Sequence, residues 1–224
     1  MAIIHNTTLT PGKLDLLRDW LPGRPWYAGA GSPELSRAGG FRLDDPAGDV
    51  GIEFMIVADS AADLPVYYLA PVTYRGEPLP GADAALIGTS DHGVLGRRWV
   101  YDGVHDFVLV AQLLALIQGL VEAQAQGRSD TPDPTVSVGA TTGSRLGALG
   151  ATVRDGGSST LVDVGVEDPA AARDGLVTLE IRRLLAPHEA DPRPASAGGY
   201  VDGGWTGLDG TGRRGRLVTL IPAG

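Results

Sequence analysis

The glycine and proline content of this 224-residue sequence restricts its fold more than any other feature. The chain carries 33 glycines and 16 prolines, residues that favour tight turns and interrupt long regular elements. Apolar residues make up 43% of the sequence and charged residues 20%, which is ordinary for a globular protein with a buried core. The composition therefore predicts one large or two small globular domains with many turns and short strands.

The first half of the sequence contains one short helical pattern and several strand patterns. Thr10 and Pro11 are suited to begin a helix that Pro22-Gly23 would end. The following segments are rich in β-branched and aromatic residues and lie between turn residues. They predict strands at 35–43, 51–58, 66–74 and 94–101.

The strongest helical pattern in the chain runs from Asp106 to Gln126. Leu109, Leu113 and Leu116 recur at helical spacing, and Leu120 and other apolar residues extend the stripe. A helix with so wide an apolar surface is expected to be buried against a sheet. The first half therefore predicts an α+β fold, in which a curved antiparallel sheet packs around one long helix.

A polar segment with two prolines, residues 127–134, divides the sequence and predicts a domain boundary. We expect one domain at residues 1–128 and a second, mostly β domain at residues 135–224. Within the second domain the strand-like segments are 135–138, 159–166, 176–184 and 216–221.

Charge and cysteine content exclude several classes of partner and chemistry. The formal net charge is −9, which should repel nucleic acid and anionic membranes. The absence of cysteine excludes disulfides, thiolate nucleophiles and cysteine-ligated zinc. The N-terminal residues lack a signal-peptide pattern, and no apolar run reaches the roughly 18 residues of a membrane helix. The sequence therefore predicts a soluble cytoplasmic protein that binds neither nucleic acid nor membrane.

No catalytic motif emerges from the sequence. Lys13 is the only lysine, so a phosphate-binding loop of the Walker type is excluded. The segment Gly88–His92 lacks the final glycine of a nucleophile elbow. The four histidines, at positions 5, 92, 105 and 188, are too far apart to suggest a metal site. We therefore predict no catalytic residue, no metal and no cofactor.

Five residues are candidates for ligand binding: Trp26, Tyr27, Arg98, Tyr101 and His105. Aromatic faces stack on sugar rings, and arginine and histidine donate hydrogen bonds to hydroxyl or phosphate oxygens. Core packing is the alternative role for the three aromatic residues. The alternative for the His105-Asp106 pair is to cap the helix that begins there.

Two segments, Leu17–Tyr27 and Leu95–Asp106, resemble the cap region of actinobacterial maltokinases, and Ala38–Leu43 and Gly88–Val94 add to the likeness. Residues 1–128 are most similar to short proteins that carry this cap alone and are often labelled 1,4-α-glucan branching proteins. A branching activity is not expected, because it needs a barrel armed with carboxylates that this sequence pattern cannot form.

The second half resembles the small ATP-binding lobe of the same kinases more weakly. Asp155–Asp163 is similar to the hairpin that would cover the nucleotide, and Leu217–Ile221 to the strand before the hinge. Leu176–Leu184 is similar to the strand that carries the phosphate-pairing lysine, whose place is taken here by Leu179. The resemblance implies that this cation, the metal ligands and the catalytic lobe are missing.

Together these features predict a non-catalytic binding or regulatory protein of α-glucan, trehalose or maltose metabolism. Its partner would be an enzyme of glycogen or trehalose metabolism or a sugar ligand. Three alternatives stay open: a maltokinase-like half that becomes an active sugar kinase with a separate lobe, an enzyme acting on glucans, and a structural module without a ligand.

Overall fold

The computed structural model describes residues 9–29, 31–128, 130–140, 145–169, 173–186 and 198–222. Its strands are β1 (Leu9–Thr10), β2 (Leu35–Leu43), β3 (Gly51–Asp59), β4 (Val66–Arg75), β5 (Leu86–His92), β6 (Gly96–Asp102), β7 (Gln124–Ala125), β8 (Ser137–Ala140), β9 (Gly147–Asp155), β10 (Ser159–Asp168), β11 (Arg173–Arg182), β12 (Leu184–Leu185), β13 (Gly199–Thr206) and β14 (Gly212–Pro222). Its helices are α1 (Lys13–Trp20) and α2 (Phe107–Ile117), with short 3-10 turns η1 (Leu21–Gly23), η2 (Asp83–Ala85) and η3 (Gly103–His105).

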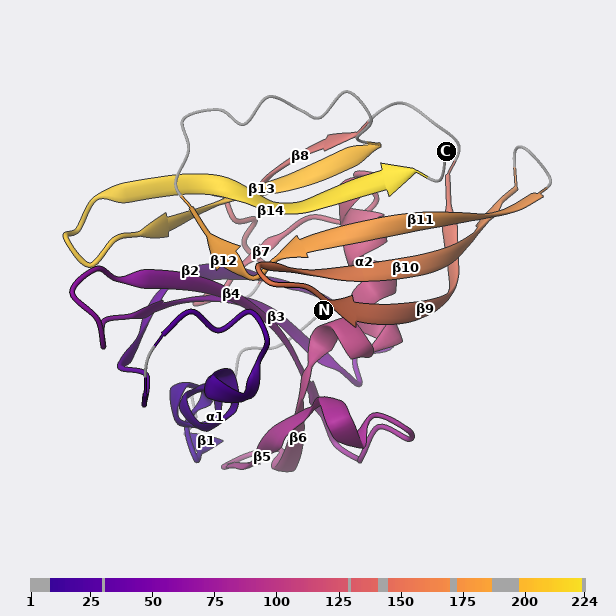
Figure 1. Ribbon diagram of the computed structural model, residues 1–224. Coiled ribbons are helices and arrows are strands. Elements are labelled where there is room, and N and C mark those ends of the chain that lie inside the picture. Colours follow the sequence, from indigo (N-terminus) through magenta and orange to yellow (C-terminus); the bar gives the residue numbers. More distant parts are fainter. Residues whose placement is uncertain are drawn as a thin grey trace.

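The 14 strands form one hydrogen-bonded sheet in which every pairing is antiparallel (Figure 1). The main order is β1-β5-β6-β4-β3-β2-β13-β14-β11-β10-β9, while β12 pairs with β4, β7 with β2 and β8 with β13. The strands of the first and second halves join where Trp205 on β13 pairs with Gly39 on β2, and again where β12 pairs with β4. A Cβ atom at Gly39 would lie 3.1 Å from Trp205 Cβ, so glycine permits this close approach.

The expected α+β fold with a long central helix is wrong, because the described residues are mostly antiparallel sheet with two short helices. The helix expected at Asp106–Gln126 is α2, and it spans only Phe107–Ile117. Gly119 adopts a φ of 70°, the left-handed conformation that commonly ends a helix. Beyond it, Leu120 is 41% exposed, and the chain soon returns to the sheet as β7.

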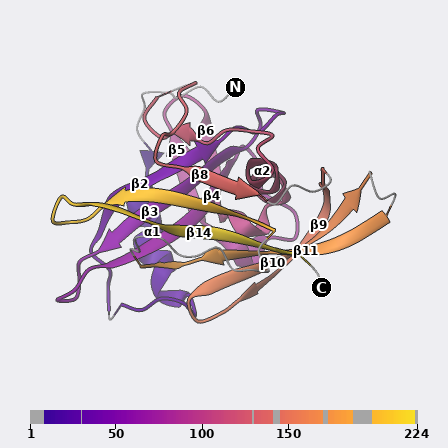
Figure 2. The same cartoon turned by 90° about the horizontal axis from the view of Figure 1, so that it is seen from above.

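Two apolar clusters lie on opposite faces of β3. The larger cluster places Phe54 and Ile56 against Leu113 of α2, and residues of the second half such as Leu179 and Trp205 belong to it as well. The smaller cluster places Met55 and other residues on the reverse face against α1 and the segment that follows it. Figures 1 and 2 show α1 and α2 on the two sides of the β2–β3–β4 layer.

In the part of the chain that the structure describes, every helix is too short or too polar to cross a membrane.

Candidate functional site

Strand β3 places two buried acidic residues on the face that α1 covers. Alternation along the strand directs Glu53, Met55, Val57 and Asp59 to this face. Glu53 and Asp59 are each only 3% exposed, although an ionised carboxylate is costly to bury without partners. Because each buried carboxylate needs a set of donors, the surroundings of Glu53 and Asp59 are the places to look for function.

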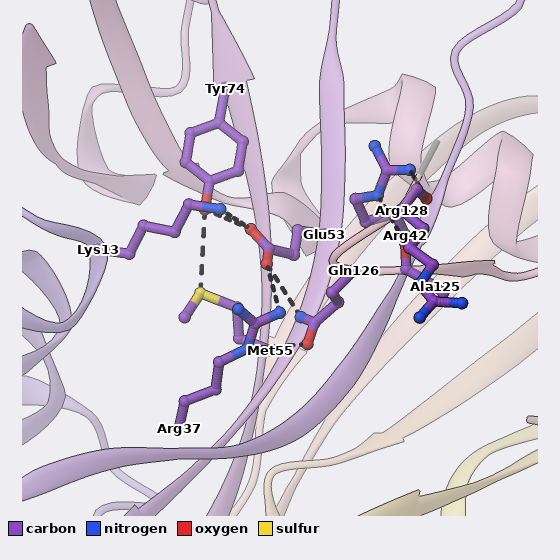
Figure 3. Close-up of polar contacts among 9 residues, drawn as sticks. All are labelled: Lys13, Arg37, Arg42, Glu53, Met55, Tyr74, Ala125, Gln126 and Arg128. Atoms are coloured by element: carbon purple, nitrogen blue, oxygen red, sulfur yellow. Dashed lines mark hydrogen bonds and ion pairs between the residues drawn. The ribbon is translucent and has the colours of Figure 1, made fainter. Parts of the chain in front are cut away.

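Glu53 receives donors on both of its carboxylate oxygens (Figure 3). Its Oε2 atom accepts hydrogen bonds from Lys13 Nζ and from the Tyr74 hydroxyl, the latter at 2.9 Å. Its Oε1 atom accepts a 2.9 Å hydrogen bond from Gln126 Nε2 and lies 3.9 Å from Arg37 Nη2. The buried negative charge is therefore stabilised by one amide, one hydroxyl and two cations.

Gly40 on β2 makes the approach of Gln126 possible. Its φ is +125°, a conformation that side chains disfavour. A Cβ atom there would lie 2.1 Å from the Phe54 carbonyl oxygen and 2.7 Å from Gln126 Nε2. The missing side chain thus leaves the space through which the Gln126 amide reaches Glu53.

Tyr74 acts as a neutral donor in this cluster. Its pKa is raised well above the ordinary value of 10.0, first by burial and then by the charge of Glu53. The hydroxyl therefore stays protonated and donates a hydrogen bond to the carboxylate. Lys13 Nζ also lies 4.9 Å from the centre of the Tyr74 ring, a cation–π contact that helps to hold the ammonium in place.

Two cationic side chains lie at the buried carboxylate, and we call Lys13 and Arg37 the cationic rim (Figure 3). Arg37 donates through Nε to Gln126 Oε1 at 3.0 Å. Arg42 donates to the carbonyl oxygens of Ala125 and Arg128, each at 3.3 Å. The side chains of Lys13 and Arg37 are 36% and 49% exposed, so the rim faces solvent while Glu53 lies beneath it.

Of the residues predicted from the sequence, Trp26 lies inside the protein. It is 1% exposed, and its ring packs edge to face with Trp20 at a centroid distance of 5.6 Å. The Tyr68 ring lies 6.1 Å away, and the Arg183 guanidinium carbon lies 4.9 Å from the Trp26 ring centre. These contacts occupy Trp26 in internal packing.

Tyr27 is half-buried beside the second buried carboxylate. Its ring stacks on Tyr68 at 5.8 Å, and its hydroxyl donates to Asp59 Oδ2 at 3.3 Å. Burial, followed by the charge of Asp59, raises the pKa of Tyr27 to about 12. Asp59 also accepts backbone N–H groups of Glu34 and Ala61, so this carboxylate fixes the loop before β2.

Arg98, Tyr101 and His105 have different surroundings. Tyr101 is 2% exposed, and its hydroxyl accepts the Leu79 N–H at 2.9 Å. Half-buried Arg98 donates to the Leu95 carbonyl oxygen at 2.9 Å, whereas His105 is exposed in η3. The structure thus brings Trp26 and Tyr27 together on Tyr68, while the contacts of Arg98 and Tyr101 lie in other segments.

The residue after His105 serves the helix that follows. Asp106 caps α2 by accepting the Val108 N–H at 3.1 Å. It also receives two 2.7 Å hydrogen bonds from Arg75. Asp106 therefore fixes both the start of α2 and the end of β4.

Sequence reasoning missed the Glu53 cluster. One signal was present: Glu53 is the only charged residue within the apolar run Gly51–Ala58. A lone carboxylate in a strand with both faces buried requires cationic or donor partners. Those partners, Lys13 and Gln126, are 40 and 73 positions away in the sequence.

The segment from the end of α1 to the start of α2 has a recognisable relative. Residues 20–106 match the maltokinase N-terminal cap domain. We refer to this stretch as the cap segment. It includes Trp26, Glu53 and Tyr74 but neither Lys13 nor Gln126, and it covers well under half of the chain. No curated protein matches the sequence.

Proposed function

We propose that this chain is a non-catalytic binding protein of α-glucan, trehalose or maltose metabolism that acts in the cytoplasm through an enzyme partner or a sugar ligand. The observation that carries the proposal is the match of residues 20–106 to the maltokinase cap domain. A cap domain is an accessory part of a kinase, so its presence links the chain to this area of metabolism without requiring catalysis.

The position of Leu179 supports a non-catalytic role. Leu179 stands where the resemblance to a kinase places the phosphate-pairing lysine, and its side chain is fully buried in the larger apolar cluster. A cation at this position would have to be buried among apolar side chains at considerable cost. The single lysine, Lys13, pairs with Glu53 on the other face of β3, away from the cluster that contains Leu179.

The packing of the aromatic residues favours an enzyme partner or a ligand recognised by charge over a neutral sugar stacked on rings. Trp26 and Tyr101 are buried, so their faces are occupied by protein. Tyr27 is partly exposed, but it already stacks on Tyr68. Polar and cationic groups such as Lys13 and Arg37 are more accessible.

Titration calorimetry of the full chain with ATP and magnesium tests the non-catalytic part. We expect no binding heat at micromolar protein, because one lost charge-assisted contact costs about 1.5–3 kcal/mol. We also expect no transfer of phosphate to maltose. A dissociation constant below about 10 µM for ATP would instead favour a kinase half that is completed by a separate lobe.

Binding measurements test the association with α-glucan metabolism. The immobilised full chain would be exposed to maltose, trehalose and maltoheptaose, and then to purified enzymes that build or degrade α-glucans. We expect saturable binding of at least one of them and none of an unrelated acidic enzyme. If every sugar and every enzyme fails to bind, the proposal is wrong.

A further inference from the structure

The charge around Glu53 is opposite to the charge of the protein as a whole. The chain has a formal net charge of −9, yet both cations of the cationic rim lie at one buried carboxylate. Glu53 neutralises only one of these two charges. Asp15, the acid nearest to Lys13 in sequence, is paired with Arg18 at 2.7 Å. The rim therefore keeps an excess of positive charge that attracts anions.

The donors of the rim are held in place before any ligand arrives. Glu53 fixes the Gln126 amide through a 2.9 Å hydrogen bond, and Gln126 in turn fixes Arg37 Nε at 3.0 Å. Tyr74 and Glu53 likewise hold the Lys13 ammonium. Because these side chains are already ordered, a ligand would lose little affinity to the entropy of arranging them.

Two different cations project from this framework toward solvent. The planar Arg37 guanidinium uses Nε for Gln126, and its side chain is 49% exposed. Lys13 adds a compact ammonium whose side chain is 36% exposed. An arginine that offers paired N–H groups beside a lysine that offers a point charge is a combination suited to phosphate oxygens. A dianion gains from both cations, whereas a neutral sugar gains little.

We propose that the cationic rim is a binding site for the phosphate group of a small phosphate monoester. Lys13 and Arg37 bind the phosphate oxygens. Glu53, Tyr74 and Gln126 position the donors from below without touching the ligand. This inference rests on the proposed function only where it names sugar phosphates as one source of the phosphate group.

The single lysine provides a selective probe. Growth with isotope-labelled lysine gives the full chain one lysine side-chain NMR signal, that of Lys13. Inorganic phosphate, a hexose phosphate, adenosine monophosphate and the unphosphorylated hexose would be titrated at constant ionic strength. We expect a saturable shift with the phosphate compounds and none with the neutral hexose. The relative affinities of the three phosphate compounds then identify the preferred source of the phosphate group.

Arg37→Gln is the informative variant, because this half-exposed side chain can change without disturbing the core. We expect it to weaken phosphate binding by about tenfold or more, the effect of losing a charge-assisted contact. Arg97→Gln is the matched control, since Arg97 is an exposed arginine paired with Asp91 in another part of the cap segment. It should leave the affinity unchanged.

The inference is overturned if the phosphate compounds leave the Lys13 signal unshifted at constant ionic strength. It is also overturned if Arg37→Gln and Arg97→Gln bind the phosphate compounds equally well. Binding of α-glucan enzymes and neutral sugars is measured on the unmodified chain, so it does not depend on that result. Failure of the phosphate site and failure of the proposed function are therefore separate outcomes.

Discussion

Arg183 and Asp102 form an ion pair in the interior, in which Arg183 Nη2 donates to the two carboxylate oxygens of Asp102 at 2.9 and 2.7 Å. Asp102 ends β6 in the cap segment, whereas Arg183 follows β11 in the second half. The Arg183 guanidinium also covers the Trp26 ring, and its Nε donates to Thr160 at 2.8 Å. One buried side chain thus connects the cap segment with β10 of the second half.

We expect Asp102→Ala to destabilise the protein by about 3–5 kcal/mol, because it leaves the Arg183 charge buried without its counterion. Chemical denaturation of the variant measures this cost. The matched control removes an exposed pair: Arg154→Ala, which breaks the contact with Asp163, should cost about 0–1 kcal/mol. An equal loss of unfolding free energy in the two variants would show that the buried pair stabilises the protein no more than the exposed pair.

The end of α2 can be tested with two leucines that share one helical stripe in the sequence. Leu113 is fully buried, so Leu113→Ala should lower the free energy of unfolding by about 2–5 kcal/mol. Leu120 lies after the helix and is 41% exposed, so Leu120→Ala should change the free energy of unfolding by about 0.5 kcal/mol or less. A large effect at Leu120 would mean that the helix continues past Gly119.

Gly40→Ala should destabilise the protein by at least about 1–3 kcal/mol. The substitution combines a disfavoured φ of +125° with a clash against the Phe54 carbonyl oxygen. Gly212→Ala is the control, since no atom lies within 4 Å of the added methyl group there. Thermal unfolding of both variants measures the difference, and a neutral Gly40→Ala would contradict the described path of β2.

Tyr27 should make stability depend on alkaline pH. Its folded-state pKa of about 12 exceeds the ordinary value of 10.0, so the folded protein retains a proton that the unfolded chain loses. The stability that this proton contributes is fully present below pH 10.0 and is lost as the pH rises toward about 12. Denaturation across this range should show a shallower decline for Tyr27→Phe than for the parent protein. Tyr68 and Tyr74, whose pKa values are also raised, will contribute in both proteins. An identical decline for Tyr27→Phe and for the parent protein would contradict the raised pKa of Tyr27.

Local sequence patterns were sufficient for several strands of the cap segment. The strand predicted at 35–43 is β2, and those at 51–58 and 66–74 are β3 and β4, each extended by one residue. Apolar and β-branched residues between turn residues define such strands without distant information. The same local reasoning failed for α2, because the leucine stripe continues beyond the glycine that ends the helix.

The Glu53 cluster shows what the sequence alone determined and what only the tertiary structure decided. The sequence determined that β3 would carry one carboxylate in an apolar strand and that Lys13 would be the only lysine. The tertiary structure decided that these two side chains meet and that Gln126 passes over Gly40 to join them. The physical reason is that contacts between residues dozens of positions apart depend on sheet pairing and helix packing, which leave no local pattern in the sequence. The burial of Trp26 and Tyr101 was decided at the same level, since an aromatic residue has the same local pattern in a core as at a surface site.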